Sequence, residues 1–263
     1  MEGTIKPSNI RAIFYIDPYN PKAKTVSEMF SLLQTTNEED ANVICVFGGD
    51  GTFLHAFHKY ADRKIPFLGI NCGNVGFLIN SIEEVRGSVE IDRPVRCYTH
   101  PYLTATSIMG ENTLPPVKAF NDVWIERNCG QCCWFEVSIN GVVRIPKLTC
   151  DGCIICTQAG STGYSRSVGM IPIPYGTPLI GLVPNNASFP HGIKPMFFPI
   201  GTSITIRNLQ PYRRFTRAFY DGIEIGEVTQ ISVCVVQNGC TTAMTHDMES
   251  TDVFLDKTLS FFD

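Results

Sequence analysis

The chain has 263 residues, of which 44% are hydrophobic and 17% charged, so it can bury a core in one large domain or two modest ones. Its net charge of −4 excludes the basic footprint of a nucleic-acid-binding protein. No apolar run approaches the length of a membrane span, and the N-terminal residues lack the apolar segment of a secretion signal. We therefore expect a cytoplasmic protein with neither a nucleic-acid nor a membrane partner.

The first third of the chain alternates strand and helix patterns. Apolar, β-branched runs predict strands at residues 10–16, 43–47 and 65–70, and apolar residues at helical spacing predict helices at 23–33 and 52–61. This βαβαβ order is typical of a parallel, Rossmann-like sheet. We therefore predict an α/β domain over residues 1–98.

After residue 98, short alternating runs replace the helix pattern. They predict strands at residues 103–108, 123–126, 134–139, 142–145, 154–157, 203–206, 216–220 and 231–236. Asn140-Gly141 is a favoured two-residue hairpin turn between two of them. We therefore predict a β-rich domain over residues 99–245. The tail, residues 246–263, has helix-like apolar spacing but no predicted place in either domain.

A glycine-rich turn follows the second predicted strand. Gly48-Gly49-Asp50-Gly51-Thr52 places a carboxylate between glycines at the start of a helix. Glycine lets a ligand approach the backbone closely, and a helix N-terminus offers N–H groups to phosphate. A carboxylate beside phosphate can hold Mg²⁺ or accept a hydroxyl proton. The alternative is an ordinary structural turn.

Two further motifs follow predicted strands. Residues 69–78 form a second glycine-rich turn, in which Asn71 and Asn74 can hydrogen-bond a ribose or an adenine. Turns after neighbouring parallel strands face the same crevice, where the ligands of open α/β sheets bind. Residues 157–167, Thr-Gln-Ala-Gly-Ser-Thr-Gly-Tyr-Ser-Arg-Ser, supply hydroxyls, backbone N–H groups and one aromatic ring. These groups suit a nucleotide, and the alternative is a polar surface loop.

Together these motifs closely resemble those of the NAD kinase family. The family pattern runs Gly-Gly-Asp-Gly-Thr, Gly-x-Asn-x-Gly-x-x-Gly-Phe-Leu, Asn-Glu, Asp-Gly, Thr-Pro-Thr-Gly-Ser-Thr-Ala-Tyr-Ser and a late Asp-Gly. In the same order, this chain has residues 48–52, 69–78, Asn121-Asp122, Asp151-Gly152, 157–165 and Asp221-Gly222. The resemblance implies a Rossmann-like α/β domain followed by a β-sandwich-like domain, in homodimers or homotetramers.

The resemblance also implies a reaction, the transfer of phosphate from ATP or polyphosphate to the 2′-hydroxyl of the NAD adenosine ribose. Mg²⁺ or another divalent cation would accompany ATP, with no metal site fixed by the protein alone. Asp50 takes the catalytic position, where it would deprotonate or orient the hydroxyl or help to place the metal. The phosphate path would be lined by Gly48, Gly49, Gly51 and Thr52. The positions that bind NAD would be Gly51, Asn74, Phe77, Asn121, Asp122, Asp151, Ala159, Thr162, Gly163, Tyr164, Ser167 and Asp221.

The chain departs from the family pattern on the NAD side. Asp122 is one methylene shorter than the family's Glu, Gln158-Ala159 replaces Pro-Thr, and Gly163 replaces Ala. Because the Asp50 turn is intact, we still expect an active kinase. One alternative is a kinase of the same superfamily with a lipid hydroxyl as acceptor, which would share only the Gly-Gly-Asp-Gly-Thr turn.

The second alternative is a protein without catalytic turnover, either a nucleotide-binding protein or an interaction protein stabilised by zinc. Cys129-x-x-Cys132 and Cys150-x-x-Cys153 have the spacing of a zinc ribbon. However, the residues between the two pairs predict a β-hairpin rather than a separate ribbon. The remaining cysteines, of eleven in all, suit small buried apolar positions.

Overall fold

The computed structural model describes residues 3–73 and 76–259, and the chain divides into two compact units. The first combines residues 1–100 with 238–263, and the second is residues 101–237. Both divisions fall inside long strands, β5 (Val95–Met109) and β17 (Gln230–Met244). The sequence pattern predicts boundaries at residues 98 and 245 instead. The alternation of apolar and polar residues along a strand cannot mark such a boundary, because it continues where the strand passes from one unit into the other.

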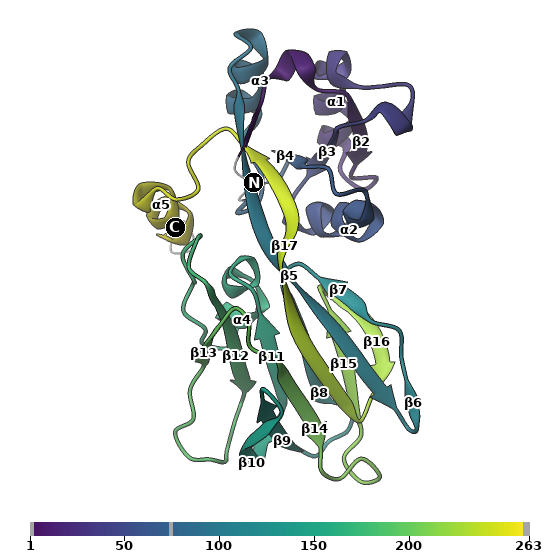
Figure 1. Cartoon of the computed structure of the whole chain (residues 1–263), viewed down its shortest axis with the longest axis vertical. Coiled ribbons are helices and arrows are strands. Elements are labelled where there is room, and N and C mark those ends of the chain that lie inside the picture. The colour runs from purple at the N-terminus through teal and green to yellow at the C-terminus, as the bar shows by residue number, and fades with distance from the viewer. Residues whose placement is uncertain (1–2, 74–75, 260–263) are drawn as a thin grey trace. The chain divides into compact units, whose positions relative to one another are not determined.

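The first unit is an α/β fold. Its parallel strands are β2 (Ala12–Ile16), β3 (Val43–Gly48) and β4 (Phe67–Asn71), in that order, and the end of β17 lies parallel beside β4. The short strand β1 (Gly3–Ile5) pairs antiparallel with the start of β5. The helices of this unit are α1 (Pro21–Met29), α2 (Asp50–Tyr60), α3 (Ile82–Glu90) and α5 (Thr251–Leu259) (Figure 1). The predicted α/β class is confirmed.

The strand β3 lies at the centre of this unit. Every residue from Val43 to Gly48 is buried, as expected for a parallel strand covered on both faces. The following helix, α2, packs Phe53 and Phe57 against Phe67 of β4. Because Asn20 caps α1 and Pro21 is its first residue, that helix begins two residues before the predicted start. The helix ends at Met29, and a 3₁₀ turn continues to Leu33.

The second unit is built from two antiparallel sheets. One sheet has the order β13–β12–β11–β8–β15–β16. The other contains β10–β9–β14–β17, and β5, which pairs with β17, also pairs with β6 and β7. Their bounds are β6 (Asn112–Thr113), β7 (Val117–Ala119), β8 (Asp122–Arg127), β9 (Cys133–Ile139), β10 (Val142–Cys150), β11 (Gly152–Cys156), β12 (Leu179–Asn185), β13 (Met196–Pro199), β14 (Ile204–Asn208), β15 (Thr216–Tyr220) and β16 (Ile223–Glu227). The short helix α4 (Tyr164–Ser167) follows a 3₁₀ turn, η5 (Ala159–Thr162). The predicted β-rich class is confirmed.

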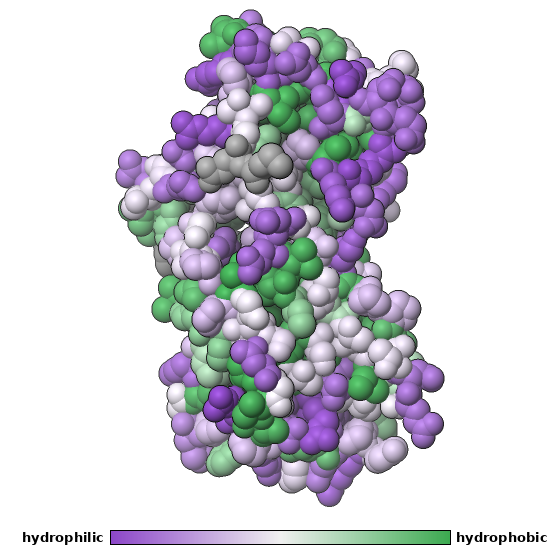
Figure 2. Space-filling view, in the orientation of Figure 1, coloured by the Kyte–Doolittle hydropathy of each residue, from purple (hydrophilic) through white to green (hydrophobic). Residues whose placement is uncertain are grey.

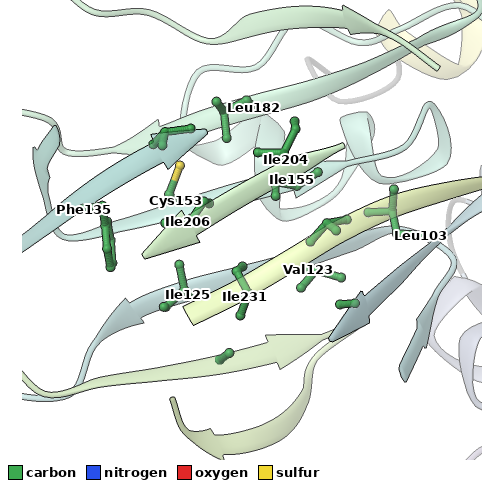
Figure 3. Packing of buried hydrophobic residues seen from close by; sticks show 14 of the residues in the cluster. Leu103, Val123, Ile125, Phe135, Cys153, Ile155, Leu182, Ile204, Ile206 and Ile231 are labelled. Carbon is green, nitrogen blue, oxygen red and sulfur yellow. The ribbon is translucent and has the colours of Figure 1, made fainter. Parts of the chain in front are cut away.

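The core of the second unit lies between its two sheets. Figure 3 shows side chains from both sheets pointing toward one another, including Val123, Ile155 and Ile206, which are fully buried. The strand β12 was not predicted from the sequence. Its run Leu-Ile-Gly-Leu-Val-Pro-Asn shows no alternation, because residues 180–184 are all buried and both faces of the strand are covered.

The surface shown in Figure 2 mixes hydrophobic with hydrophilic residues over both units. Among the helices in the described ranges, none is both long enough and apolar enough to cross a membrane.

Candidate functional site

In the first unit, the predicted catalytic aspartate begins a helix. Asp50 is the first residue of α2, and the preceding Gly49 has extended backbone dihedrals. Gly49 donates its N–H to Thr52 Oγ1 at 3.4 Å, and its carbonyl accepts from Phe53 N at 3.0 Å. The turn therefore passes directly from the carboxyl end of β3 into a helix N-terminus, the geometry that suits a phosphate group.

The Asp50 carboxylate joins the first two sequence motifs. Its Oδ2 accepts from Phe77 N at 2.9 Å, and its Oδ1 accepts from Leu78 N at 3.1 Å. The ends of β3 and β4 are also linked, since Cys72 N donates to Gly48 O at 2.9 Å. The sequence indicated a substrate role for this side chain, and the structure adds that it fixes the backbone of the 76–78 segment.

The other residues predicted in this turn differ in what surrounds them. A Cβ on Gly48 would lie 2.3 Å from Thr52 Oγ1, so packing requires glycine there. A Cβ on Gly49 or Gly51 would meet nothing within 4 Å. These two glycines leave open space beside the backbone, as close approach of a phosphate requires. Asn74 lies outside the described residues, and Phe77 contributes its backbone N–H to Asp50.

Sequence reasoning missed two polar residues that shape this end of the sheet. Asp17 follows β2 directly, and its Oδ2 accepts from Thr52 Oγ1 at 2.9 Å. Asn80 is fully buried, and its Nδ2 donates to Gly69 O at 2.9 Å and to Ala243 O at 3.0 Å. An acid directly after a strand, the signal that marked Asp50, would have found Asp17. Nothing local marks Asn80, because its partner at 243 is distant in sequence.

In the second unit, Asp221 organises the Asn-Asp motif. Its carboxylate accepts from the backbone N–H groups of Phe120 at 2.6 Å, Asn121 at 2.7 Å and Asp122 at 3.1 Å. Asp221 occupies the turn between β15 and β16 with φ of +46°. The turn therefore aims the Asp221 carboxylate at the backbone of the Asn-Asp motif.

The 157–167 loop packs closely on the same motif. Thr157 N donates to Asn121 O at 2.8 Å, and Thr157 Oγ1 donates to Phe120 O at 2.7 Å. A Cβ on Gly160 would lie 2.1 Å from Asn121 O. The structure thus brings together Asn121, Asp122, Asp221 and the start of this loop within the second unit.

This contact gives a prediction for two glycines of one loop. We expect Gly160→Ala to lower the free energy of unfolding by about 2 kcal/mol or more, because its methyl group overlaps backbone that cannot move aside cheaply. Gly163→Ala is the matched control. The nearest atom to its Cβ is 3.6 Å away, so we expect a change within about 0.5 kcal/mol. Urea denaturation measures both, and equal losses would contradict the close approach of Gly160 to Asn121 O.

Asp122 is buried, with 4% of its surface exposed. Burial, and then the negative charge of Asp221, raises the pKa of Asp122 to about 8. The ordinary pKa of aspartate is about 4. Between about pH 4 and about pH 8, the folded protein therefore keeps a proton that the unfolded chain has lost.

A pH dependence of stability follows from this difference. Because the folded state binds more protons in that window, the free energy of unfolding falls as pH rises through it and levels off above about pH 8. We expect Asp122→Asn to remove this component, so that its unfolding free energy varies less with pH. Urea titrations of both proteins from about pH 5 to about pH 8 test this, and parallel curves would contradict the raised pKa.

The remaining loop residues are held mostly by local bonds. Thr162 Oγ1 donates to Ala159 O at 3.1 Å, and Ser167 Oγ donates to Tyr164 O at 2.7 Å. The Tyr164 hydroxyl accepts from Asn185 Nδ2 at 3.3 Å. Tyr164 is 37% exposed, and its ring lies edge-on to Trp124 with centroids 5.2 Å apart. Tyr164 therefore presents a fixed, partly open ring.

Asp151 lies between two side chains on the same unit. Its Oδ1 is 2.9 Å from Arg127 Nε, and its Oδ2 accepts from Asn186 Nδ2 at 2.9 Å. Backbone bonds support the same position, since Arg127 N donates to Asp151 O and Asp151 N donates to Asn185 O, both at 2.9 Å. This carboxylate is thus oriented by partners on both sides.

The four cysteines with zinc-ribbon spacing do not form one cluster. Cys150 and Cys153 are buried in the hydrophobic core, whereas Cys129 and Cys132 are half-buried in the loop between β8 and β9. Among the described residues, no three His, Cys, Asp or Glu side chains are arranged to hold a metal ion. The zinc alternative therefore has no support in this structure.

Comparisons with known proteins agree with the motifs. Residues 13–87 match the family model for the ATP-NAD kinase N-terminal domain. The chain is 31% identical over 229 residues to the NAD kinase of Rickettsia akari, covering 86% of this chain and 88% of that protein. It is also 31% identical over 209 residues to the NAD kinase of Caulobacter vibrioides, covering 80% of each.

Solved structures share the fold. Yeast NADH kinase, complexed with NADH, superposes with a TM-score of 0.82 at 18% identity, covering 99% of this chain and 94% of that one. An NAD kinase from Archaeoglobus fulgidus, in complex with ATP, gives a TM-score of 0.73 at 22% identity, covering 95% and 98%.

Proposed function

Because this chain belongs to the NAD kinase family, we propose that it transfers a phosphoryl group from ATP or polyphosphate to the 2′-hydroxyl of the adenosine ribose of NAD. The product is NADP. The observation that carries the proposal is the placement of Asp50 at the N-terminus of α2, oriented by the N–H groups of Phe77 and Leu78. A lipid acceptor is not favoured, because the likeness to NAD kinases extends over 86% of the chain.

Asp50 would act on the hydroxyl that becomes phosphorylated. Phosphoryl transfer depends mostly on positioning and charge neutralisation, and two backbone hydrogen bonds fix the orientation of this carboxylate. Gly49 and Gly51, where an added Cβ would meet nothing within 4 Å, would let the donor phosphates approach the helix N-terminus. Asp50 would then accept the hydroxyl proton or hold the hydroxyl in line with the phosphate.

The second unit would bind the adenosine part of NAD. Asn121 Oδ1 is buried and has no hydrogen-bond partner in the described part of the chain, a costly state that a ligand N–H or O–H would relieve. Asp122 would supply a carboxyl and Tyr164 an aromatic ring. Asp221 would act through the backbone of residues 120–122, which it holds in place.

A divalent cation would enter with ATP. The donor phosphates would hold most of this metal, with no metal site fixed by the protein alone. When bound, Mg²⁺ neutralises charge that develops on the transferred phosphoryl group. Asp50 and Asp17 are the carboxylates at this end of the sheet that could contribute oxygen ligands.

The assembly and location of the protein are further parts of the proposal. We infer a homodimer or homotetramer, as the resemblance to the family implies, and a cytoplasmic location. The eleven cysteines are all free thiols, as is usual for proteins of a reducing compartment. Gel filtration with light scattering would give the oligomeric state, and a monomer would contradict that part.

One assay tests the activity. Purified protein is incubated with NAD, ATP and MgCl₂, and NADP is followed with an NADP-specific dehydrogenase. Parallel reactions replace NAD by NADH, ATP by polyphosphate, or omit MgCl₂. We expect NADP with NAD and ATP and a large loss without the cation. Absence of NADP and NADPH in every reaction, from protein that melts cooperatively, would contradict the proposed function.

A further inference from the structure

The loop between β8 and β9, residues 128–132, carries two cysteines that the proposed reaction does not use. Cys129 and Cys132 are half-buried, whereas Cys133, Cys150 and Cys153 are fully buried or nearly so. The loop turns sharply, with bends at residues 128–131. Two thiols in a Cys-x-x-Cys arrangement, within reach of solvent, have the spacing found in redox-active pairs.

Side chains hold the two sulfurs within this loop. Cys129 Sγ donates to Gln131 O at 3.7 Å, so its side chain folds back along the loop in the direction of Cys132. The Arg214 guanidinium lies 3.5 Å from Cys132 Sγ, and its Nη1 also donates to Cys132 O. Burial, and then the neighbouring thiols of Cys129 and Cys132, raise the pKa of Cys133 to about 12. Cys133 therefore stays protonated and unreactive beside the pair.

The same loop is bonded to residues proposed to bind NAD. Arg127 Nη1 donates to Cys129 O at 3.1 Å, while Arg127 Nε lies 2.9 Å from Asp151 Oδ1. Asp151 N donates to Asn185 O, and Asn185 Nδ2 donates to the Tyr164 hydroxyl. One guanidinium thus connects the cysteine loop to Asp151, and the neighbouring strand connects Asp151 to Tyr164.

We propose that Cys129 and Cys132 form a reversible disulfide with each other by exchange with a small disulfide such as oxidised glutathione, and that this bond weakens NAD binding through Arg127 and Asp151. The effect on NAD rests on the proposed function, whereas formation of the bond does not. To reach the sulfur of Cys132, Cys129 Sγ leaves the Gln131 carbonyl. The loop backbone then shifts, and with it the Cys129 carbonyl that Arg127 contacts.

The chemistry of the exchange is balanced. Cys132 loses its proton to solvent, and its thiolate attacks one sulfur of the small disulfide and expels the other as a thiolate, which takes up a proton. Cys129 loses its proton to solvent, attacks the Cys132 sulfur and expels the second small thiolate. Two protein thiols are oxidised and one small disulfide is reduced to two thiols. Excess reduced glutathione reverses both steps.

Peptide mass spectrometry tests the bond directly. The full-length protein is equilibrated in glutathione buffers of increasing oxidised fraction, alkylated and digested with trypsin without reduction. We expect the peptide of residues 128–144 to escape alkylation at Cys129 and Cys132 and to weigh about 2 Da less than the free dithiol. Cys129→Ser and Cys132→Ser should abolish the bridge, and Cys234→Ser, which removes an exposed thiol elsewhere, should leave it. A reduced peptide in every buffer, or a bridge to Cys133, would overturn the proposal.

Steady-state kinetics test the coupling. On oxidation, we expect the KM for NAD to rise by about threefold to tenfold, the scale of one net hydrogen bond, with kcat and the KM for ATP within about twofold. Arg127→Lys keeps the charge but lacks the fork that joins Cys129 O to Asp151, so the oxidised and reduced forms should differ less in KM. A bridge without a KM change would contradict the coupling alone. If the reduced protein makes no NADP, the proposed function fails, and the peptide masses still decide the bond.

Discussion

Asp50→Asn is expected to lower kcat for NADP formation by about 10²-fold or more, the scale of a lost acid–base group. The amide can neither accept the ribose proton nor give Mg²⁺ an anionic oxygen ligand. It also has one acceptor atom where the carboxylate has two, whereas the structure uses both oxygens, for Phe77 N and Leu78 N. The substitution therefore also loosens the 76–78 segment. Stopped NADP assays at saturating NAD and ATP measure kcat.

Two controls separate a loss of catalysis in Asp50→Asn from a loss of folded protein. Asp40→Asn changes an exposed carboxylate that accepts from Asn37 Nδ2, and its kcat should stay within about twofold of the unmodified protein. Thermal unfolding of Asp50→Asn checks that the protein remains folded. A kcat close to the unmodified value would reject the role given to Asp50. A loss confined to the KM for NAD would leave Asp50 only a positioning role.

Asp221→Ala is expected to lower the free energy of unfolding by about 3 kcal/mol or more, because three backbone N–H groups lose their acceptor at about 1–3 kcal/mol each. Alanine also adopts the positive φ of this turn poorly, which costs about 1–2 kcal/mol. With the backbone of residues 120–122 released, we expect the KM for NAD to rise about tenfold, the equivalent of one lost hydrogen bond. Urea denaturation and NADP assays measure the two effects.

Asp221→Asn is the matched variant. It keeps one carbonyl oxygen for the N–H groups and tolerates the left-handed backbone, so less than half of the loss in stability is expected. Both variants remove the negative charge of Asp221, which raises the pKa of Asp122, so both should lower that pKa. Equal stability of Asp221→Ala and the unmodified protein would contradict the bonding described here.

Much of the fold follows from local pattern. The run 43–47 is continuously apolar and β-branched, and it forms the central strand of a parallel sheet because such strands are covered on both faces. The hairpin at Asn140-Gly141 forms as predicted, with both residues at positive φ. The strand β12 escaped prediction because a buried antiparallel strand with Gly181 and Pro184 has neither alternation nor a typical strand composition.

In the candidate site, too, the sequence predicts some features and leaves others to the tertiary structure. The Gly-Gly-Asp-Gly-Thr turn could be assigned from its sequence, because glycines and one acid after a strand define both backbone and charge locally. The partners of the acid could not be assigned. Asp50 bonds residues 27 and 28 positions away, and Asp221 bonds residues 99 to 101 positions away.

The sequence alone determined the class of each unit, the family resemblance and the identity of the acid expected to act on the hydroxyl. These depend on residue type and short spacing, which the chain itself carries. Only the tertiary structure decided that Asp221 supports a backbone loop, that Gly160 is required by Asn121 O, and that two cysteines of the zinc-like set are core residues while the other two lie in a loop. Such roles arise from contacts between distant segments, and no local pattern encodes which segments will meet.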